Sequence, residues 1–224
     1  MPKHMRIDFV SDVVCPWCVI GLKALEQALA NAADVVVADI HFQPFELNPD
    51  MPAAGEDIAE HVARKYGSTP EQSAASRAMI RQTAADLGFT IAMPDGSRIH
   101  NTFAAHRLLH WAAEHGKQAA LKMALFDAYF TDGANPDDTE VLVAAAQKAG
   151  LDPRGAQGVL TRGRYIDEVR RDERFWREQG ISAVPAIIID RKYLISGGQP
   201  VAAFEKAIWS IAAEAPDSVG AGAD

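Results

Sequence analysis

Apolar residues follow two kinds of pattern along this chain of 224 residues. Near the N-terminus, residues 5–14 form a short apolar run, residues 19–30 repeat apolar side chains at helical spacing, and residues 34–42 return to a β-branched run. A short β-branched run favours a strand, and apolar residues three or four apart favour a helix. The pattern therefore predicts two parallel strands joined by a helix.

From residue 56 onward the pattern becomes helical, with hardly any strand character. Local signals bound several of these segments: Thr69 precedes Pro70, Asp138 and Asp152 precede helical runs, and Gly88 ends one. A hairpin or loop over residues 89–100, with its turn at Asp95–Gly96, interrupts the series. The predicted helices span residues 57–66, 70–88, 102–115, 117–131, 139–150 and 153–163.

Strand character returns near the C-terminus. A helix over 165–179 precedes two short apolar runs at 186–190 and 193–196, which predict an antiparallel hairpin, and an amphipathic helix follows over 200–213. The order β-α-β, helices, α-β-β-α predicts an α/β protein with the thioredoxin fold and a large all-helical domain inserted in its middle. We expect residues 1–54 and 165–213 to form the thioredoxin part, 55–164 the helical domain, and 214–224 a flexible tail.

The composition is that of a globular protein, with 48% hydrophobic and 23% charged residues. A net charge of −8 disfavours nucleic acid as a partner. The chain contains no apolar run of the roughly 18 residues that a membrane span needs. The first residues enter a strand pattern without a long apolar core or a small-residue cleavage site, so we expect no secretory signal and a cytoplasmic protein.

The two cysteines of the chain lie at the junction between the first strand and the first helix, as Cys15-Pro16-Trp17-Cys18. Unpaired N–H groups and the positive end of the helix dipole favour a thiolate at this position. The motif predicts a redox site in which Cys15 is the nucleophile and Cys18, one turn further along, is the resolving thiol. A structural zinc site needs four ligands, and no second cysteine pair is present, so we expect no metal.

A second predicted element of the site is Val184-Pro185, directly before the strand at 186–190. In a thioredoxin fold a proline at this point lies opposite the cysteine motif. We expect a cis peptide bond there, which would turn the backbone of Val184 toward Cys15 and leave it free for an extended substrate. Trp17 would add an aromatic face for apolar substrate contact.

Other polar residues are ambiguous. His106 and His110 are four residues apart on one predicted helix, as metal ligands can be, but no third ligand stands out, and we favour a packing role. Asn101, His106 and Arg107 begin the helix expected to face the cleft, where they would line it or cap the helix. Asp12 is either a hydrogen-bond acceptor near the motif or a loop charge.

Several segments resemble one known family. They are SDVVCPWCVIG, FELNPDMP (with Glu46 and Asn48), NTFAAHRLLHWA, AVPAIIID and YLISGGQP, and they are similar to the DsbA-like thioredoxin-fold oxidoreductases, the FrnE-type branch in particular. The resemblance implies thiol–disulfide exchange on proteins or small thiols, without a metal or an organic prosthetic group. It assigns the nucleophile to Cys15, the resolving thiol to Cys18 and the cis-proline to Pro185. Better-studied members carry a histidine where Trp17 stands, so a strongly oxidising potential is not implied.

The same resemblance extends to 2-hydroxychromene-2-carboxylate isomerase and kappa-class glutathione transferases, which carry serine in place of the first cysteine. The alternative is therefore a glutathione-dependent isomerase or transferase acting on a small aromatic electrophile. Gly198 and Gln199 precede the last helix, whose free N–H groups could hold a carboxylate of glutathione, or they form an ordinary turn. A non-catalytic binding module is disfavoured, since binding alone needs neither sulfur. The pattern is compatible with a monomer or a homodimer.

Overall fold

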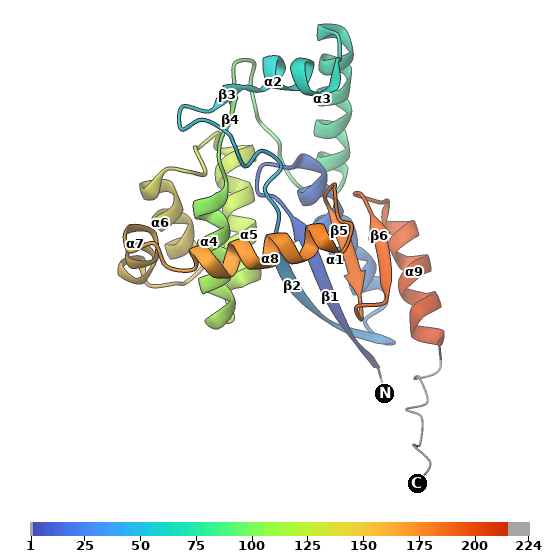
Figure 1. Cartoon of the computed structure of the whole chain (residues 1–224). Coiled ribbons are helices and arrows are strands. Elements are labelled where there is room, and N and C mark those ends of the chain that lie inside the picture. The colour runs from blue at the N-terminus through green and yellow to red at the C-terminus, as the bar shows by residue number, and fades with distance from the viewer. Residues whose placement is uncertain (1, 215–224) are drawn as a thin grey trace.

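A four-stranded sheet in the order β2-β1-β5-β6 forms the centre of the computed structural model, which describes residues 2–214 (Figure 1). Strands β1 and β2 are parallel, and β5 pairs antiparallel with both β1 and β6, as the predicted hairpin requires. Residues 215–224 of the predicted tail lie outside the described residues. The strands of this sheet are β1 (Lys3–Ser11), β2 (Val36–Pro44), β5 (Ala186–Ile189) and β6 (Tyr193–Ser196).

Alternate residues of β1 face opposite sides of the sheet. Phe9 is buried in a cluster with helix α1 (Pro16–Asn31), which packs against α9 (Val201–Ala213). Val10 is buried with Trp176 of α8 (Ile166–Glu178), which crosses the other face (Figure 1). The sheet is thus covered by helices on both faces, as the thioredoxin fold requires.

The helical insertion lies between β2 and α8. Its helices begin close to the predicted positions because side chains cap their first turns: Thr69 forms a capping box with Gln72, and Asp138 and Asp152 accept from the N–H groups of their helices. The helices are α2 (Ile58–Tyr66), α3 (Pro70–Asp86), α4 (Phe103–Glu114), α5 (Gln118–Phe126), α6 (Thr139–Lys148) and α7 (Pro153–Thr161).

Two predicted segments of the insertion differ in detail. Residues 89–100 do not pair with themselves; β4 (Arg98–Ile99) instead pairs antiparallel with β3 (Glu56–Asp57), which precedes α2. The predicted helix over 117–131 is α-helical only to Phe126 and continues as the π-helix η1 (Asp127–Thr131).

The insertion is attached to the sheet through its edge strand β2. The side-chain amide of Gln118 on α5 accepts from the backbone N–H of Phe42 and donates to the carbonyl of Phe42, both at 2.9 Å. Apolar side chains of the insertion and of the face of the sheet that α1 covers form one continuous core. Among residues 2–214, no helix has the length and apolar character that crossing a membrane requires.

Candidate functional site

The cysteine motif begins helix α1. Cys15 is the N-cap residue, without a side-chain cap hydrogen bond, and Pro16 occupies the first turn, where a missing N–H is tolerated. Both thiols are free; Cys15 is 4% exposed and Cys18 fully buried. The start of α1 therefore presents its unpaired N–H groups and positive dipole end at Cys15, where they stabilise a negative charge.

Cys18 lies behind Cys15 in the core. Burial raises the pKa of the Cys18 thiol well above its ordinary value, and the hydrogen bond and charge of Cys15 raise it further. The charge of Lys122 acts in the opposite direction. Cys18 is thus held as a thiol, and any reaction that needs its thiolate must remove this proton.

The Val184–Pro185 peptide bond is cis, and it faces the cysteine motif. The Cys15 thiol donates to the carbonyl of Val184 at 3.7 Å, the weak, long hydrogen bond expected of sulfur. The carbonyl of Pro185 accepts from the N–H of Gly197 at 2.8 Å, which ties this loop to the turn after β6.

The turn before α9 packs directly on the motif. A Cβ atom on Gly198 would lie 2.8 Å from the carbonyl oxygen of Trp17, so only glycine allows this approach. Gln199 donates its amide to the carbonyl of Ser196 at 2.7 Å, inside the turn. Gly198 thus lies against the half-buried Trp17, whereas the side-chain amide nitrogen of Gln199 forms a hydrogen bond within the turn.

Asp12, just before the motif, is a buried acceptor. One carboxylate oxygen accepts from the N–H of Leu47 at 2.8 Å, and the other lies 3.4 Å from Nε2 of His106. Burial alone would raise the pKa of Asp12, but His106, with the Leu47 N–H and Thr102, leaves it below its ordinary value. The contact between Asp12 and His106 therefore links the motif loop to helix α4.

The other histidine of the i, i+4 pair points elsewhere. His110 faces Asp172 at 3.6 Å and stacks on Tyr165 with ring centres 5.0 Å apart. Within residues 2–214 no group of three His, Cys, Asp or Glu side chains could hold a metal ion. Arg107 does not line a cleft, because it donates to carbonyl groups near the end of α7, that of Val159 among them.

Beside Asp12 and His106 lies a second buried charge cluster. Arg170 of α8 pairs with Glu46 and Glu173 and stacks over Phe103, 3.7 Å from its ring centre. Burial raises the pKa of Glu46, as does the charge of Glu173, while Arg170 lowers it. Asn101 donates to Glu46 at 3.3 Å, so it contacts this cluster.

Asn48, in the loop after β2, contacts helix α2. Its side-chain oxygen lies 3.0 Å from Nε2 of His61 and accepts from Lys65 at 2.8 Å. Asn48 therefore joins the loop to the insertion.

Lys122 is a buried cation of this region that the sequence pattern does not reveal. It lies on α5 with 1% of its surface exposed, and its ammonium nitrogen is 5.0 Å from the ring centre of Phe126 and 6.0 Å from that of Phe42. In the sequence, Lys122 stands among the apolar residues of the segment QAALKMALF. A lysine there can equally extend its head to the surface, so its burial could not be deduced from the pattern.

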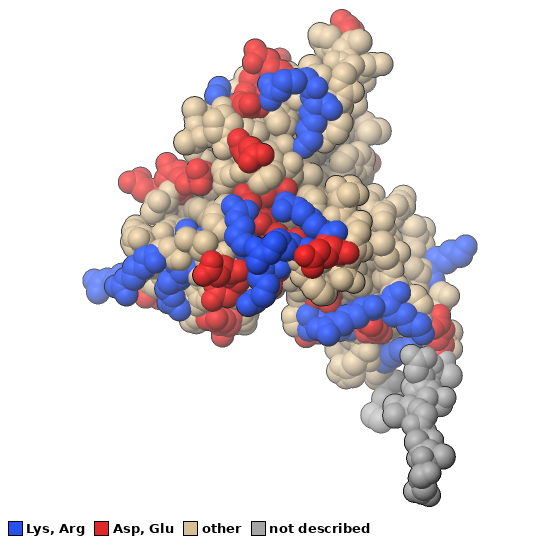
Figure 2. All heavy atoms as spheres, viewed as in Figure 1, with Lys and Arg blue, Asp and Glu red and all other residues tan. Residues whose placement is uncertain are grey.

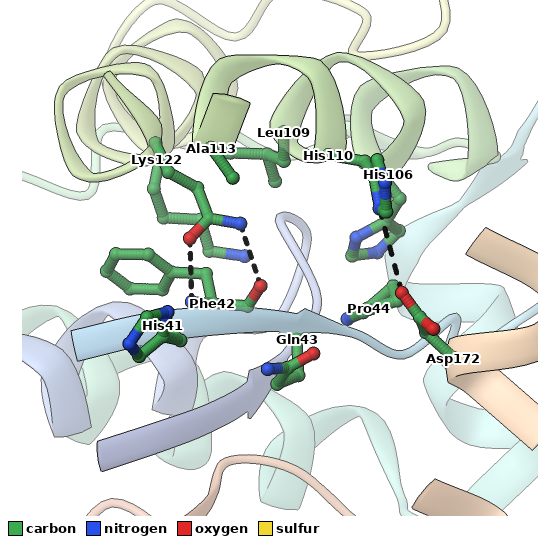
Figure 3. Close-up of a pocket in the computed structure, with 11 residues that line it drawn as sticks. His41, Phe42, Gln43, Pro44, His106, Leu109, His110, Ala113, Lys122 and Asp172 are labelled. Carbon is green, nitrogen blue, oxygen red and sulfur yellow. Dashed lines mark hydrogen bonds and ion pairs between the residues drawn. The ribbon is translucent and has the colours of Figure 1, made fainter. Parts of the chain in front are cut away.

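A cavity of about 200 Å³ separates β2 from α4 and α5 (Figure 3). Lys122 descends from α5 on one side of it, and His106 lies on the other (Figure 3). Its other lining residues are His41, Phe42, Gln43, Pro44, Leu109, His110, Ala113, Gln118 and Asp172.

Comparison with known proteins gives one family for most of the chain. The profile of the DSBA-like thioredoxin domain matches residues 6–209. The uncharacterized protein YwbO of Bacillus subtilis is 30% identical over 209 residues, which cover 93% of this chain and 96% of YwbO. The crystal structure of a probable DsbA oxidoreductase from Streptomyces coelicolor shares 35% identity and a TM-score of 0.87, over 95% of this chain and 92% of that one.

Two more distant structures share the fold. A 2-hydroxychromene-2-carboxylate isomerase has a TM-score of 0.66 at 16% identity, over 92% of this chain and 95% of its own. The cytosolic disulfide reductase DsbM of Pseudomonas aeruginosa, in a structure with GSH, has a TM-score of 0.58 at 16% identity, over 92% of this chain and 98% of its own.

Proposed function

Because this chain belongs to the DSBA-like thioredoxin domain family, we propose that it is a thiol:disulfide oxidoreductase whose redox centre is Cys15 and Cys18. The observation that carries the proposal is the arrangement of the two sulfurs. Cys15 starts α1 and meets the carbonyl of Val184 at 3.7 Å, while Cys18 lies buried behind it. A nucleophilic thiol at the start of a helix, with a second thiol buried behind it, is the arrangement that two-step exchange uses.

The proposed reaction has two thiolate attacks. The Cys15 thiolate attacks one sulfur of a substrate disulfide; a bond forms between Cys15 and that sulfur, and the other substrate sulfur leaves with the electron pair. Cys18, as its thiolate, then attacks Cys15, closes the intramolecular disulfide and releases the second substrate thiolate. The substrate is reduced by two electrons and the protein is oxidised by two; the reverse sequence oxidises a substrate dithiol.

We propose that the substrate, a protein or small-thiol disulfide, lies along Val184 and Pro185. The Val184 carbonyl lies 3.7 Å from the Cys15 thiol, where a substrate backbone that pairs with Val184 would bring its disulfide next to Cys15. Trp17, half-buried within the motif, would pack on apolar parts of the substrate. In the cytoplasm, where we expect the protein, the dithiol would be the resting form.

The test uses the two cysteine variants. Cys15→Ser should abolish reduction of a mixed glutathione–peptide disulfide, since no nucleophile remains. Cys18→Ser should accumulate a covalent adduct on Cys15, detected by mass spectrometry, because the second attack is lost. Full exchange activity in Cys15→Ser would contradict the mechanism, and the double variant controls for non-specific adducts.

The direction of electron flow follows from the reduction potential of the pair, measured in glutathione buffers through the fluorescence of Trp17. A potential near about −270 mV would indicate a reductase, and one near about −120 mV an oxidant.

A glutathione-dependent isomerase or transferase is the second candidate. It is favoured by the fold shared with the isomerase and with a glutathione-bound reductase, and by the start of α9, which has no side-chain cap. Glutathione would then be a co-substrate, with a carboxylate near Gly198 and Gln199. Saturable glutathione binding by calorimetry, with turnover of an aromatic electrophile retained in Cys18→Ala, would select this function over disulfide exchange.

A further inference from the structure

The cavity between β2 and the insertion has no part in the proposed exchange reaction. Its volume is about 200 Å³, and its lining includes none of Cys15, Cys18 and Val184. The walls come from β2 on one side, from α4 and α5 on the other, and from α8 at Asp172 (Figure 3). A ligand in this cavity would therefore contact both the thioredoxin framework and the insertion, without contacting either cysteine.

Lys122 brings a buried positive charge to this cavity. Figure 3 shows its side chain descending from α5 toward β2, and only 1% of the residue is exposed. Its nitrogen lies 6.0 Å from the ring centre of Phe42 and 5.0 Å from that of Phe126. Within residues 2–214, no oxygen atom accepts a hydrogen bond from this nitrogen, and no carboxylate lies within ion-pair distance of it. Burial lowers the pKa of Lys122 to about 8, so most molecules still carry the charge at pH 7. A buried cation without an acceptor favours an anionic ligand.

The other polar side chains of the lining contact protein groups of their own. Gln118, for example, is bonded to both backbone groups of Phe42. The lining side chains with such partners are Gln43, Gln118, His41, His106, His110 and Asp172. The cavity therefore offers one uncompensated positive charge and few spare donors. Inorganic phosphate, with four oxygen atoms and up to two charges at neutral pH, would leave most of its oxygen atoms without a donor.

The remaining lining residues are apolar. They are Phe42, Pro44, Leu109 and Ala113, from the facing walls of β2 and α4. A cavity of roughly 150 Å³ can hold a molecule of the size of benzene, so this one has room for about six to eight non-hydrogen atoms. A single negative charge on a short apolar body matches such a lining better than a compact inorganic anion does.

We propose that this cavity binds a small monocarboxylate, whose carboxylate accepts hydrogen bonds from the Lys122 ammonium and whose alkyl chain packs on Phe42, Leu109 and Ala113. The ligand is not a substrate of the exchange reaction, since it contacts neither cysteine. It contacts β2, α4 and α5 together, so its binding stabilises the insertion against the edge of the sheet, and with it the folded protein.

The test is a titration of the reduced full chain with butanoate at pH 7 and constant ionic strength, followed by ¹H–¹⁵N NMR. We expect saturable shift changes below about 10 mM, because a ligand of six non-hydrogen atoms reaches only modest affinity. The shifted amides should include those of Phe42 and Leu109, in the two facing walls. Butanamide has the same shape without the charge and should bind at least about tenfold more weakly, as should phosphate.

Variants assign the binding to this cavity. Lys122→Met should weaken butanoate binding at least about tenfold, and it places an apolar chain in apolar surroundings, so we expect it to fold. Lys117→Met, which replaces an exposed lysine just before α5, should bind as the wild type does. Ala113→Leu fills the cavity from α4 and should weaken binding with Lys122 still in place. Cys15→Ser should bind butanoate as tightly as the wild type.

Several outcomes would overturn the proposal. They are the absence of saturable shifts, equal binding in Lys122→Met or Ala113→Leu, and binding of butanamide or phosphate as tight as that of butanoate. Loss of binding in Cys15→Ser would place the carboxylate at the cysteine motif instead. None of these measurements depends on exchange activity, so the carboxylate site and the proposed function stand or fall separately.

Discussion

At the scale of single residues, the site depends on a close backbone approach at Gly198. Trp17, Gly21 and Gly198 meet with no room for a side chain. The turn before α9 thereby fixes the position of the motif.

We predict that Gly198→Ala destabilises the protein by about 1–3 kcal/mol and slows disulfide exchange, since the added methyl group would meet the Trp17 carbonyl oxygen at 2.8 Å. Urea unfolding and the exchange assay measure the two effects. Gly158→Ala is the matched control: its Cβ meets nothing within 4 Å inside α7, so helix propensity should stabilise the protein by about 1 kcal/mol. Equal stability of the two variants would contradict the packing argument.

Some of these residues could be predicted from the sequence and others could not. Local sequence motifs indicate Cys15, Cys18, Val184 and Pro185. The partners of Asp12 do not, because His106 reaches it only once α4 has docked beside β2. Lys122 could not be predicted either, because the apolar pattern of its helix does not show whether its ammonium group reaches solvent or lies in the core.

At the scale of elements, helix α8 has one face of exposed charged side chains and another face that is buried. Figure 2 shows basic and acidic side chains gathered together over this helix. Arg170 holds Glu46, from the loop after β2, against Glu173 of its own helix. This cluster joins the C-terminal half of the thioredoxin fold to its N-terminal half.

We predict that Arg170→Met lowers stability by about 2–3 kcal/mol at pH 7, less than a fully buried pair would, because the Arg170 side chain is 37% exposed. The loss should shrink as the pH falls toward 5. The folded-state pKa of Glu46 is already raised above its unfolded value by burial, and removing Arg170 raises it further, so protons bind preferentially to the folded variant.

Denaturant unfolding at pH 5, 6 and 7 measures this dependence. Arg171→Met, on the same helix with a side chain 64% exposed, should change stability by less than about 1 kcal/mol at each pH. A loss in Arg170→Met that does not vary with pH would contradict the role of Glu46.

Element boundaries were predictable where a cap marks them. Thr69, Asp138 and Asp152 bond the N–H groups of their own helices, so the signal is local. The pairing of β3 with β4 was not predictable, because each strand has two residues, too few for any periodicity. The π-helical turn after Phe126 also has no counterpart in the apolar pattern.

At the scale of the whole molecule, the insertion and the thioredoxin framework share one core. Leu142 of α6, Leu121 and Leu125 of α5, and Ile7 of β1 belong to the same buried cluster. A helical segment whose apolar face packs against the sheet has little stability without that packing.

We therefore predict a single cooperative unfolding transition. Far-UV circular dichroism, dominated by the helices, and tryptophan fluorescence should give the same midpoint in urea. Trp111 reports on the insertion and Trp176 on α8, so single-tryptophan variants can compare the two parts. Midpoints that differ between these two probes would show that the insertion unfolds on its own.

The Gln118 side chain has a consequence for how this protein behaves in a crowded solution. It occupies the outer backbone groups of Phe42, in the place where a further strand would bind, and so closes part of an edge on which another chain could grow a sheet. The insertion thus blocks intermolecular strand addition at this part of the edge. An extended chain bound at the cis-proline loop, as proposed, would then find this part of β2 already occupied.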